Sequence, residues 1–251
     1  MKQPESGRLF ILTGPSCIGK SPLVRSLGRF YPGVWESFQQ LVLYNDRDPR
    51  PGEVDGVQYH FRPREEIQAL EDNPDFLVMD VRGDLQALDQ RTLKKSLQKG
   101  DVFYEGNPYL GSFLQQSPNL ADITRISIFM SPLSKDEILV LRENHPQLDL
   151  PALVTDIMRR KLLRRTRKQK GELSLPDLEN VEQRAGAAYR EMQQAHKFTY
   201  VLPNHDGEDS ENWDAFYFPL GEARVALKTV VSLLQGNIPE VLETWERDFL
   251  S

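Results

Sequence analysis

The fold is decided by residues 8–27, which read RLFILTGPSCIGKSPLVRSL. In this stretch a short apolar run, Leu9 to Leu12, meets a loop from Gly14 to Ser21 that fits the pattern G-x-x-x-x-G-K-[ST]. Glycines at both ends of such a loop allow consecutive backbone N–H groups to curl around a polyphosphate chain. Leu23 and Leu27 follow at helical spacing. The sequence therefore predicts a strand before the loop and, after it, a helix whose positive N-terminal end faces the phosphates.

This loop predicts a site for ATP and Mg2+. Lys20 would reach the β- and γ-phosphates and act in catalysis, and the Ser21 hydroxyl would bind the metal. Cys17 is either a small loop filler or a thiol whose pKa is lowered by the helix N-terminus. The residues expected to hold the nucleotide in this loop are Gly14, Ser16, Cys17, Ile18, Gly19, Lys20 and Ser21.

The composition is that of an ordinary soluble protein. Of the 251 residues, 27% are charged and 39% are hydrophobic, and no apolar run approaches the length of a bilayer span. A net charge of −6 argues against a broad surface for nucleic acid, and the single cysteine cannot form an internal disulfide. We therefore expect a cytoplasmic globular enzyme that binds neither nucleic acid nor membrane, and the oligomeric state is left open.

Residues 47–61, RDPRPGEVDGVQYHF, form a second motif. Their prolines and glycines predict a loop. Arg47, Arg50 and Tyr59 can converge there on a phosphate, because arginine forks match phosphate oxygens. Taken alone, the same loop is also consistent with arginines that are only solvated.

Together the two motifs resemble the guanylate kinase family of nucleoside monophosphate kinases. The resemblance implies an α/β fold, with a P-loop NTPase-type parallel sheet flanked by helices and with acceptor-binding and lid subdomains. It also implies that Arg47, Arg50 and Tyr59 grip the phosphate of the acceptor nucleotide. The single domain, residues 1–251, would comprise a core at 7–43, 88–145 and 196–236, an acceptor-binding subdomain at 44–87, a lid at 146–195 and a C-terminal helix at 237–251.

The sequence departs from the family where the acceptor base is read. Val78 stands where the family places an acidic residue that reads guanine, and residues 83–87, GDLQA, replace the family's tyrosines. Asp80 lies two residues further, on the same strand face. It either supplies the missing carboxylate or is a solvated residue at a strand end. We expect capture of the acceptor phosphate to be retained, while recognition of the base stays open.

Polar residues follow two further predicted strands. Residues 101–107, DVFYEGN, predict a buried strand, and ligands bind at the carboxyl ends of parallel strands. Glu105 is therefore expected to act on the acceptor or on Mg2+, unless it only caps the following turn, and Asn107 is expected near the acceptor base. Asn204 resembles a family position near the adenine of ATP, with an Asx-turn as the alternative.

A basic run covers residues 159–170, RRKLLRRTRKQK. Such a run is normally a solvated helix face, but in the family this region is an arginine-bearing lid that closes on the triphosphate. Residues 181–191 resemble the helix that returns from the lid, and they make Arg184 the first candidate for a catalytic lid arginine. The further catalytic candidates are Arg164, Arg165 and Arg167.

These features predict ATP-dependent phosphoryl transfer to a phosphorylated acceptor, first of all a GMP-like nucleoside monophosphate, which gives the diphosphate and ADP. A kinase of another phosphorylated small molecule, such as a sugar phosphate, is an alternative because the guanine-reading residues are missing. A non-catalytic binding module is a further alternative. The intact Lys20–Ser21 pair argues against that module, since a scaffold has no physical need for a phosphate cradle.

Overall fold

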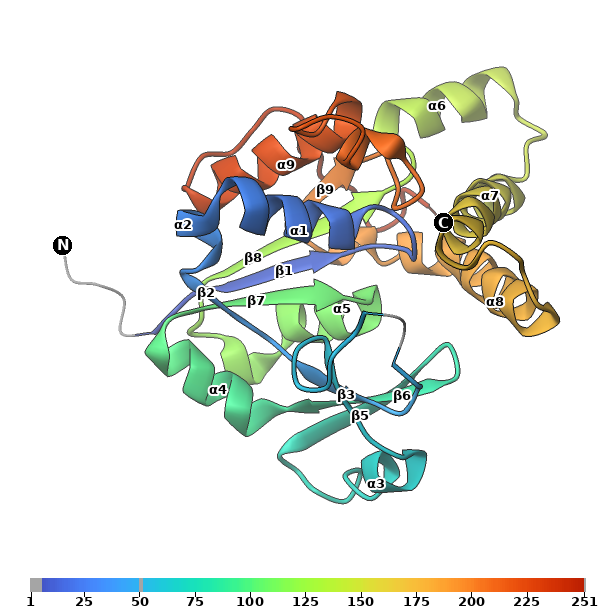
Figure 1. The fold of residues 1–251 in the computed structure, drawn as a ribbon. Helices are drawn as coiled ribbons and strands as arrows, with labels where there is room; N and C mark the ends of the chain where they lie inside the picture. The colour runs from blue at the N-terminus through green and yellow to red at the C-terminus, as the bar shows by residue number, and fades with distance from the viewer. Residues whose placement is uncertain (1–5, 50–51, 251) are drawn as a thin grey trace. The chain divides into compact units, whose positions relative to one another are not determined.

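Strands alternate with helices in this computed structural model, which describes residues 6–49 and 52–250 (Figure 1). Within those residues five strands form one sheet in the order β2-β7-β1-β8-β9, and four form another in the order β4-β3-β6-β5. The strands are β1 (Leu9–Thr13), β2 (Phe38–Gln40), β3 (Leu43–Asn45), β4 (Tyr59–Phe61), β5 (Phe76–Val81), β6 (Asp84–Asp89), β7 (Asp101–Gly106), β8 (Arg125–Ser131) and β9 (Tyr200–Pro203). The mixed α/β architecture and the helix-flanked parallel sheet predicted from the sequence are confirmed.

Helices follow most of these strands. The α-helices are α1 (Lys20–Phe30), α2 (Pro32–Trp35), α3 (Arg64–Gln68), α4 (Gln90–Lys99), α5 (Pro108–Gln116), α6 (Lys135–Asn144), α7 (Leu150–Lys170), α8 (Leu175–Met192) and α9 (Gly221–Leu234). Short 3₁₀ turns are η1 (Pro118–Leu120), η2 (Ala195–Lys197) and η3 (Glu211–Trp213). No helix within 6–49 and 52–250 combines the length and the apolar character that are needed to cross a bilayer.

The chain divides into two compact units. Unit 1 comprises residues 1–10, 37–104 and 121–125, and unit 2 comprises residues 11–36, 105–120 and 126–251. Strands β1, β7 and β8 each pass from one unit into the other along their own length. The predicted division into core, acceptor-binding subdomain and lid stays a prediction.

Unit 1 holds the sheet formed by β3 to β6. Strand β3 pairs in parallel with β4, while β6 pairs antiparallel with β3 and with β5. The β5–β6 turn has positive φ at Arg82 (59°) and Gly83 (91°), as the tight turns of twisted hairpins require. Ile67 of α3 and Leu85 and Ala87 of β6 form the buried core of this sheet.

Two element boundaries in unit 1 differ from the sequence prediction. The apolar run at 38–44 predicts one strand, but it makes two, because β2 pairs with β7 while β3 pairs with β4 and β6. The helical spacing of Leu88, Leu93 and Leu97 predicts a helix from Leu88, but the helix begins at Gln90, since Leu88 pairs with Leu77 in the sheet. Asp89 then caps α4 by accepting a 2.9 Å hydrogen bond from the Thr92 N–H.

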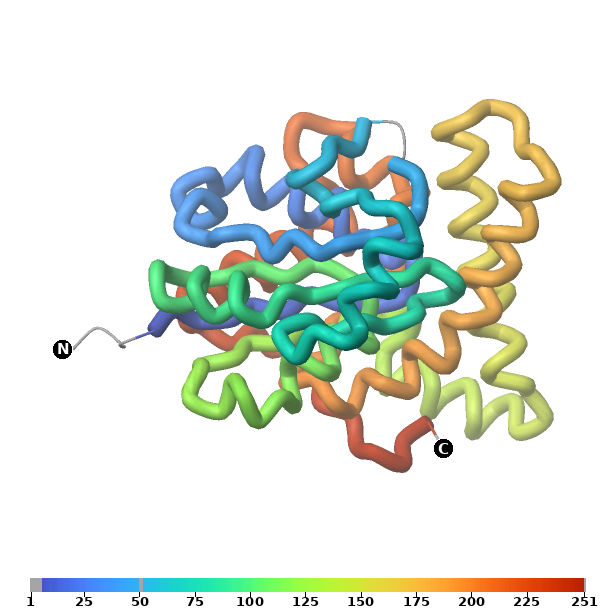
Figure 2. The backbone as a smooth tube through the Cα atoms, turned by 90° about the horizontal axis from the view of Figure 1, so that it is seen from below, coloured from blue at the N-terminus to red at the C-terminus, as the bar shows by residue number. Residues whose placement is uncertain are grey.

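Unit 2 holds the loop that follows β1 and all the helices from α5 onward. Strand β8 pairs in parallel with β9, and α1 and α9 lie side by side (Figure 1). Helices α7 and α8 form a hairpin whose two arms run alongside each other in both ribbon and tube views (Figure 2). They bury small and apolar side chains at helical spacing, namely Val154, Met158 and Leu162 on α7 and Val181, Ala185 and Ala188 on α8.

The predicted C-terminal helix at 237–251 is wrong, since the described residues 237–250 form turns and a single bridge. Glu243 pairs antiparallel with Val201 of β9 through two N–H to O=C hydrogen bonds of 2.8 and 2.9 Å. Because β9 is the last strand of its sheet, this bridge covers part of an open edge. Trp245 and Leu250 are buried without helical spacing.

Candidate active site

The loop between β1 and α1 depends on two glycines in unit 2. Gly14 has φ +145°, and a Cβ there would lie 2.5 Å from the Met130 carbonyl oxygen. Gly19 has φ +107°, and a Cβ there would lie 2.7 Å from the Asp206 carbonyl oxygen. Backbone atoms cannot yield as a flexible side chain can, so both positions require glycine and the loop is held in shape by its neighbours.

Lys20 lies over the loop it belongs to. Its ammonium group donates hydrogen bonds to the carbonyl oxygens of Gly14 (2.9 Å) and Pro15 (2.8 Å). Within the described residues no side chain caps the N-terminus of α1. The positive end of the helix and the lysine charge therefore meet at the loop, which is the arrangement that binds anions.

Ser21 and Glu105 form the part of the site suited to a metal. The Ser21 hydroxyl donates to Glu105 Oε1 at 2.7 Å. Both groups offer oxygen atoms, the ligands that Mg2+ prefers, and neighbouring oxygens around an octahedral Mg2+ lie about 3 Å apart. The described residues contain no cluster of three or more His, Cys, Asp or Glu that could hold a metal. A Mg2+ here would thus take its other oxygens from phosphate and water.

Burial raises the pKa of the Glu105 carboxyl. The Ser21 hydrogen bond and the Lys20 charge lower it, and the Glu208 carboxylate raises it again. A bound cation would favour the ionised form of this carboxyl and offset the cost of burying it.

Arginines of α7 and α8 meet this loop and the segment after β9. Arg184 Nε donates to the Ser16 hydroxyl at 3.0 Å, so the first lid candidate of the sequence contacts the loop directly. Arg165 is buried and donates to Glu208 Oε2 at 3.0 Å. Arg164 donates from Nε to Asp209 Oδ2 at 2.8 Å. The fourth candidate, Arg167, is exposed.

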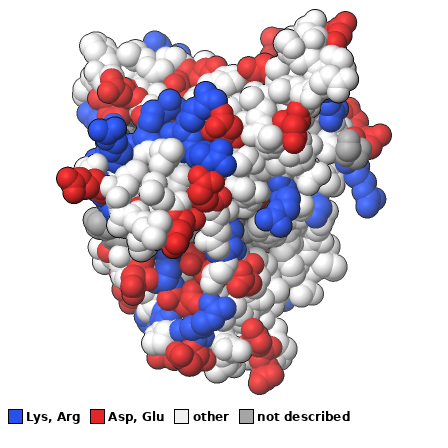
Figure 3. All heavy atoms as spheres, turned by 90° about the vertical axis from the view of Figure 1, so that its right-hand side faces the viewer, with Lys and Arg blue, Asp and Glu red and all other residues white. Residues whose placement is uncertain are grey.

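The basic helix α7 is thus not a bare cationic face. Its Arg159 pairs with Glu182 of α8 at 2.7 Å, and Arg160 pairs with Asp156 one turn before it. Figure 3 shows basic side chains interspersed with acidic ones on the face it draws. The arginines that distinguish the site are the buried Arg165 and the loop-bonded Arg184. Arg164 is exposed, although its partner Asp209 keeps only 5% of its exposure.

The segment after β9 holds the loop in place through hydrogen bonds. The fully buried Asn204 donates from Nδ2 to the carbonyl oxygens of Ile18 and Asp206, both at 2.7 Å. Trp213 Nε1 donates to the carbonyl oxygens of Asp206 (2.9 Å) and Gly207 (3.0 Å). The geometry gives Asn204 a structural task, and contact between Asn204 and adenine stays a prediction.

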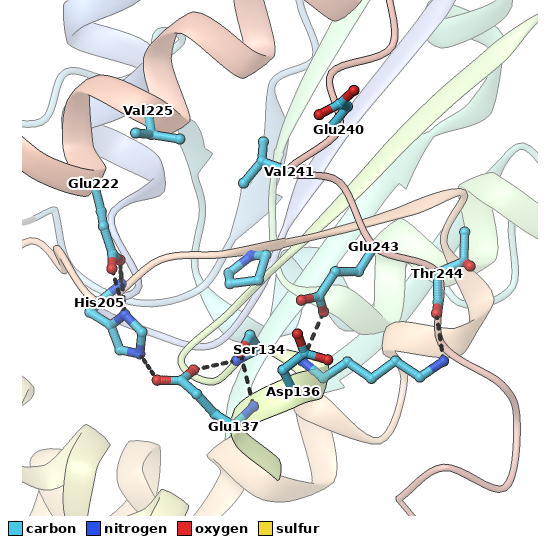
Figure 4. A pocket seen from close by; sticks show the side chains of 12 residues that line it. Ser134, Asp136, Glu137, His205, Glu222, Val225, Glu240, Val241, Glu243 and Thr244 are labelled. Carbon is cyan, nitrogen blue, oxygen red and sulfur yellow. Dashed lines mark hydrogen bonds and ion pairs between the residues drawn. The ribbon is translucent and has the colours of Figure 1, made fainter. Parts of the chain in front are cut away.

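His205 anchors the same segment from its other side. Its Nδ1 lies 2.8 Å from Glu222 Oε1 and its Nε2 lies 2.9 Å from Glu137 Oε1, at the edge of a pocket of about 730 Å³ (Figure 4). The Glu222 hydrogen bond raises the pKa of His205 despite partial burial. Its carbonyl oxygen accepts a hydrogen bond from the Lys161 ammonium of α7. The residue therefore ties α6, α7 and α9 to the segment after β9.

The predicted phosphate grip on the acceptor lies in unit 1. Both terminal nitrogens of Arg47 donate to the Glu53 carboxylate at 2.7 Å, and its guanidinium lies 5.2 Å from the Tyr59 ring centre and 5.4 Å from that of Phe61. Burial lowers the pKa of Arg47, and the Glu53 hydrogen bonds raise it above its ordinary value. The structure therefore holds one fixed, charged guanidinium beside Tyr59. Arg50 lies outside the described residues.

The base-reading segment of unit 1 is apolar where the family is acidic. Val78 packs against the buried cluster of Ile67, Leu85 and Ala87. Asp80 accepts the Gly83 N–H at 2.8 Å and lies 3.7 Å from Arg64, so it serves the β5–β6 turn. A role for Asp80 in reading a base stays a prediction.

Two further sequence candidates belong to unit 2. Asn107 caps α5, since its Oδ1 accepts the Leu110 N–H at 2.9 Å, and its place near the acceptor base stays a prediction. Burial, followed by the Glu208 charge, raises the pKa of the Cys17 thiol to about 12. The alternative of an acidic, oxidisable thiol is therefore wrong, because the loop gives the thiolate no water.

Sequence reasoning missed the partners of the lid arginines. Glu208 and Asp209 stand in a stretch that lies outside the family pattern and reads as an insertion. The available signal was a complementary pattern of charges. The basic run lies before strand β9 and the acidic pair lies after it, so an ion pair between the two could have been expected. The spacing of 43 residues between Arg165 and Glu208 gives no periodicity that would connect them.

Comparison with known proteins gives consistent results. The guanylate kinase sequence family matches residues 6–102. A guanylate kinase of Idiomarina loihiensis is 31% identical over 212 residues, which cover 82% of this chain and 83% of the relative. A guanylate kinase of Pseudomonas fluorescens is 38% identical over 96 residues, covering 38% of this chain and 45% of the relative.

A solved structure shares the fold. The crystal structure of guanylate kinase from Anaplasma phagocytophilum superposes with a TM-score of 0.52 over 92% of this chain and 86% of that one, at 16% identity. The match to the sequence family over residues 6–102 and the relative of nearly equal extent lead to one conclusion. The chain belongs to the guanylate kinase family of phosphotransferases.

Proposed function

We propose that this protein transfers the terminal phosphoryl group of ATP to a phosphorylated acceptor, first of all a GMP-like nucleoside monophosphate, and releases the diphosphate and ADP. One observation carries the proposal. The chain combines an intact polyphosphate loop, with Lys20 over it, and a fixed guanidinium at Arg47 on a second motif. A protein that only hydrolysed or only bound ATP would have no use for a second phosphate grip.

Unit 2 would hold ATP. The backbone of residues 14–19, Lys20 and the N-terminus of α1 bind the phosphate chain, and Arg184 and Arg165 offset charge on the transferring group. Ser21 and Glu105 would hold Mg2+, which supplies charge neutralisation when bound. Positioning and charge neutralisation suffice for this chemistry, so no covalent nucleophile is needed.

Unit 1 would hold the phosphate of the acceptor. Arg47 is preorganised by Glu53 and by the rings of Tyr59 and Phe61, so little side-chain entropy is lost when it binds. Tyr59 lies on the same strand as Phe61, and its phenol would bind the acceptor phosphate together with Arg47. Arg50 would be the third residue to bind this phosphate.

A different acceptor is the second candidate. The side chain at position 78 is a valine packed in an apolar cluster, and Asp80 is engaged at the β5–β6 turn. A site without a guanine-reading carboxylate loses the discrimination that a buried polar partner provides. This favours a nucleotide with another base, or a phosphorylated molecule such as a sugar phosphate.

An assay that couples ADP release to absorbance tests the proposal and separates the candidates. Purified protein, ATP and Mg2+ are mixed in turn with the nucleoside monophosphates and with a small set of sugar phosphates. Turnover with GMP supports the first candidate, and turnover only with another phosphorylated acceptor supports the second. ADP release that is independent of every acceptor would be ATP hydrolysis, with water as the acceptor, and contradicts transfer to a phosphorylated molecule. Absence of ADP release throughout also contradicts the proposal and leaves a binding role.

A further inference from the structure

Glu208 occupies a position in unit 2 that the proposed reaction does not explain. It belongs to the segment from His205 to Trp213, which lies between the phosphate-binding loop and α7. Its backbone N–H donates to the Cys17 carbonyl oxygen at 3.1 Å, so the residue is fixed to the loop itself. A Cβ at the preceding Gly207 would lie 2.3 Å from that same oxygen, which shows how closely the segment crosses the loop.

The Glu208 carboxylate forms an ion pair with Arg165, one of the cations of the site. Oε2 lies 3.0 Å from Arg165 Nη1, and the two side chains keep only 18% and 10% of their exposure. Burial alone would raise the pKa of the Glu208 carboxyl, and Arg165 and Lys20 lower it by more. Arg184 acts in the same direction. The carboxylate is therefore ionised. It is attracted by Arg165, Lys20 and Arg184, the same three cations that the phosphates of ATP would need.

Two anions cannot share these cations without cost. Like charges a few ångströms apart repel strongly where water is largely excluded, and each competes for the same donors. The neighbouring Asp209 keeps only 5% of its exposure, but its partner Arg164 keeps 63%, so water screens that pair more than it screens the Glu208–Arg165 pair. The conflict is therefore strongest at the carboxylate that reaches the buried Arg165.

We propose that Glu208 is a built-in competitor of the nucleotide's phosphates, which neutralises Arg165 in place of a phosphate oxygen and must give up this pairing when ATP binds. The inference rests on the proposed function. In this account the 205–213 segment lowers the affinity for di- and triphosphates, and so speeds the release of ADP. The ligand it discriminates against is recognised by its charge and not by its base.

Calorimetric titration of the full-length protein tests this competition. The probes are inorganic tripolyphosphate, ATP and adenosine, and the variant is Glu208→Gln, which keeps the shape and the acceptor oxygen while removing the charge. The matched control is Asp214→Asn, which makes the same charge change directly after this segment, on a side chain that keeps 67% of its exposure. Thermal unfolding confirms that each variant is folded.

We expect Glu208→Gln to bind tripolyphosphate and ATP about tenfold more tightly than wild type, or more, with adenosine and the Asp214→Asn protein unchanged. If Glu208→Gln does not fold, Glu208→Asp replaces it. Its shorter carboxylate should bind Arg165 less well and so raise the affinity for tripolyphosphate by a smaller factor.

Each other outcome has a defined meaning. Unchanged or weaker phosphate binding by the Glu208 variants, with a wild type that binds ATP and turns over, overturns the competition and leaves the proposed function intact. Binding of ATP by Glu208→Gln but not by wild type supports the competition. Failure of both proteins to bind ATP or tripolyphosphate overturns the inference and the proposed function together.

Discussion

The phosphate-binding loop of unit 2 and the acceptor motif of unit 1 both present cations, and the structure holds those cations differently. In unit 2 the partners of the arginines are far away in sequence, since Arg184 is 168 positions from Ser16 and Arg165 is 43 positions from Glu208. In unit 1 the partners of the arginines are local, since Arg47 is six positions from Glu53 and Arg62 is seven positions from Asp55.

This difference separates two kinds of recognition. The donor loop is shaped by glycines and by backbone contacts from β8 and from the segment after β9, so its form depends on the whole unit. The acceptor motif is a local loop that preorganises one guanidinium, while the strands beside it are packed by Val78 and its apolar neighbours. We expect phosphate binding in both, whereas the contacts of Asp80 and Asn204 among the described residues are structural and leave base reading a prediction.

The largest expected effect comes from Lys20→Ala. Loss of the ammonium that lies over Gly14 and Pro15 should lower kcat about 100- to 1,000-fold, because charge on the transferring group is no longer neutralised. Steady-state kinetics measure it, with the exposed Lys168→Ala as the control. Near-normal turnover of Lys20→Ala would contradict the proposal that the loop of unit 2 binds ATP.

Asn204→Ala should weaken the loop without touching a phosphate. The change removes two hydrogen bonds to backbone carbonyl oxygens and leaves a buried gap, so the free energy of unfolding should fall by about 1–3 kcal/mol. Urea denaturation measures this loss, with the exposed Asn119→Ala as the control. Unchanged stability would mean that the loop does not depend on the segment after β9.

Arg47→Lys should raise the KM for the acceptor about tenfold and leave the KM for ATP unchanged, because lysine keeps the charge but loses the fork. The control is Arg62→Lys in the same unit, whose guanidinium pairs with the exposed Asp55. An equal change in both KM values would show that the two motifs do not serve separate substrates.

His205→Gln should give the smallest effect, visible in its pH dependence. The pKa of His205 is raised above its ordinary 6.5, so its stabilising pair with Glu222 is complete below that pH and is lost as pH rises through the higher folded pKa. At pH 6 the free energy of unfolding of wild type should exceed that of the variant by less than about 1 kcal/mol, and the difference should shrink as the pH rises above 6.5. Thermal melts across this range measure it, with His145→Gln as the control. A difference that grows with pH would contradict the sign.

The loop after β1 could be predicted from sequence because its pattern is carried by consecutive residues. The spacing of Gly14, Gly19, Lys20 and Ser21 predicts a backbone shape, and the helical spacing of Leu23 and Leu27 predicts α1 close to where it lies. The helix around residues 181–191 and Arg184 were expected from the resemblance to the family, and Arg184 contacts Ser16.

The remainder depends on contacts that no local pattern records. Leu88 reads as helical but pairs with Leu77 in a hairpin, and residues 237–250 read as a helix but bridge to the edge of β9. Glu208 lies in an insertion, so neither motif nor periodicity pointed to it, and only the folded chain brings it to Arg165. Tertiary pairing overrides local propensity at each of these places.

The most direct test of the central claim compares an acceptor with its dephosphorylated form. ADP release is measured for wild-type protein with ATP, Mg2+ and the best monophosphate acceptor, and again with the same molecule lacking its phosphate, such as GMP against guanosine. Phosphate capture by Arg47 and Tyr59 predicts rapid ADP release with the monophosphate and at least about 100-fold less with the dephosphorylated form. Equal rates with both, or no release with any monophosphate, would contradict an enzyme built from two phosphate-binding halves.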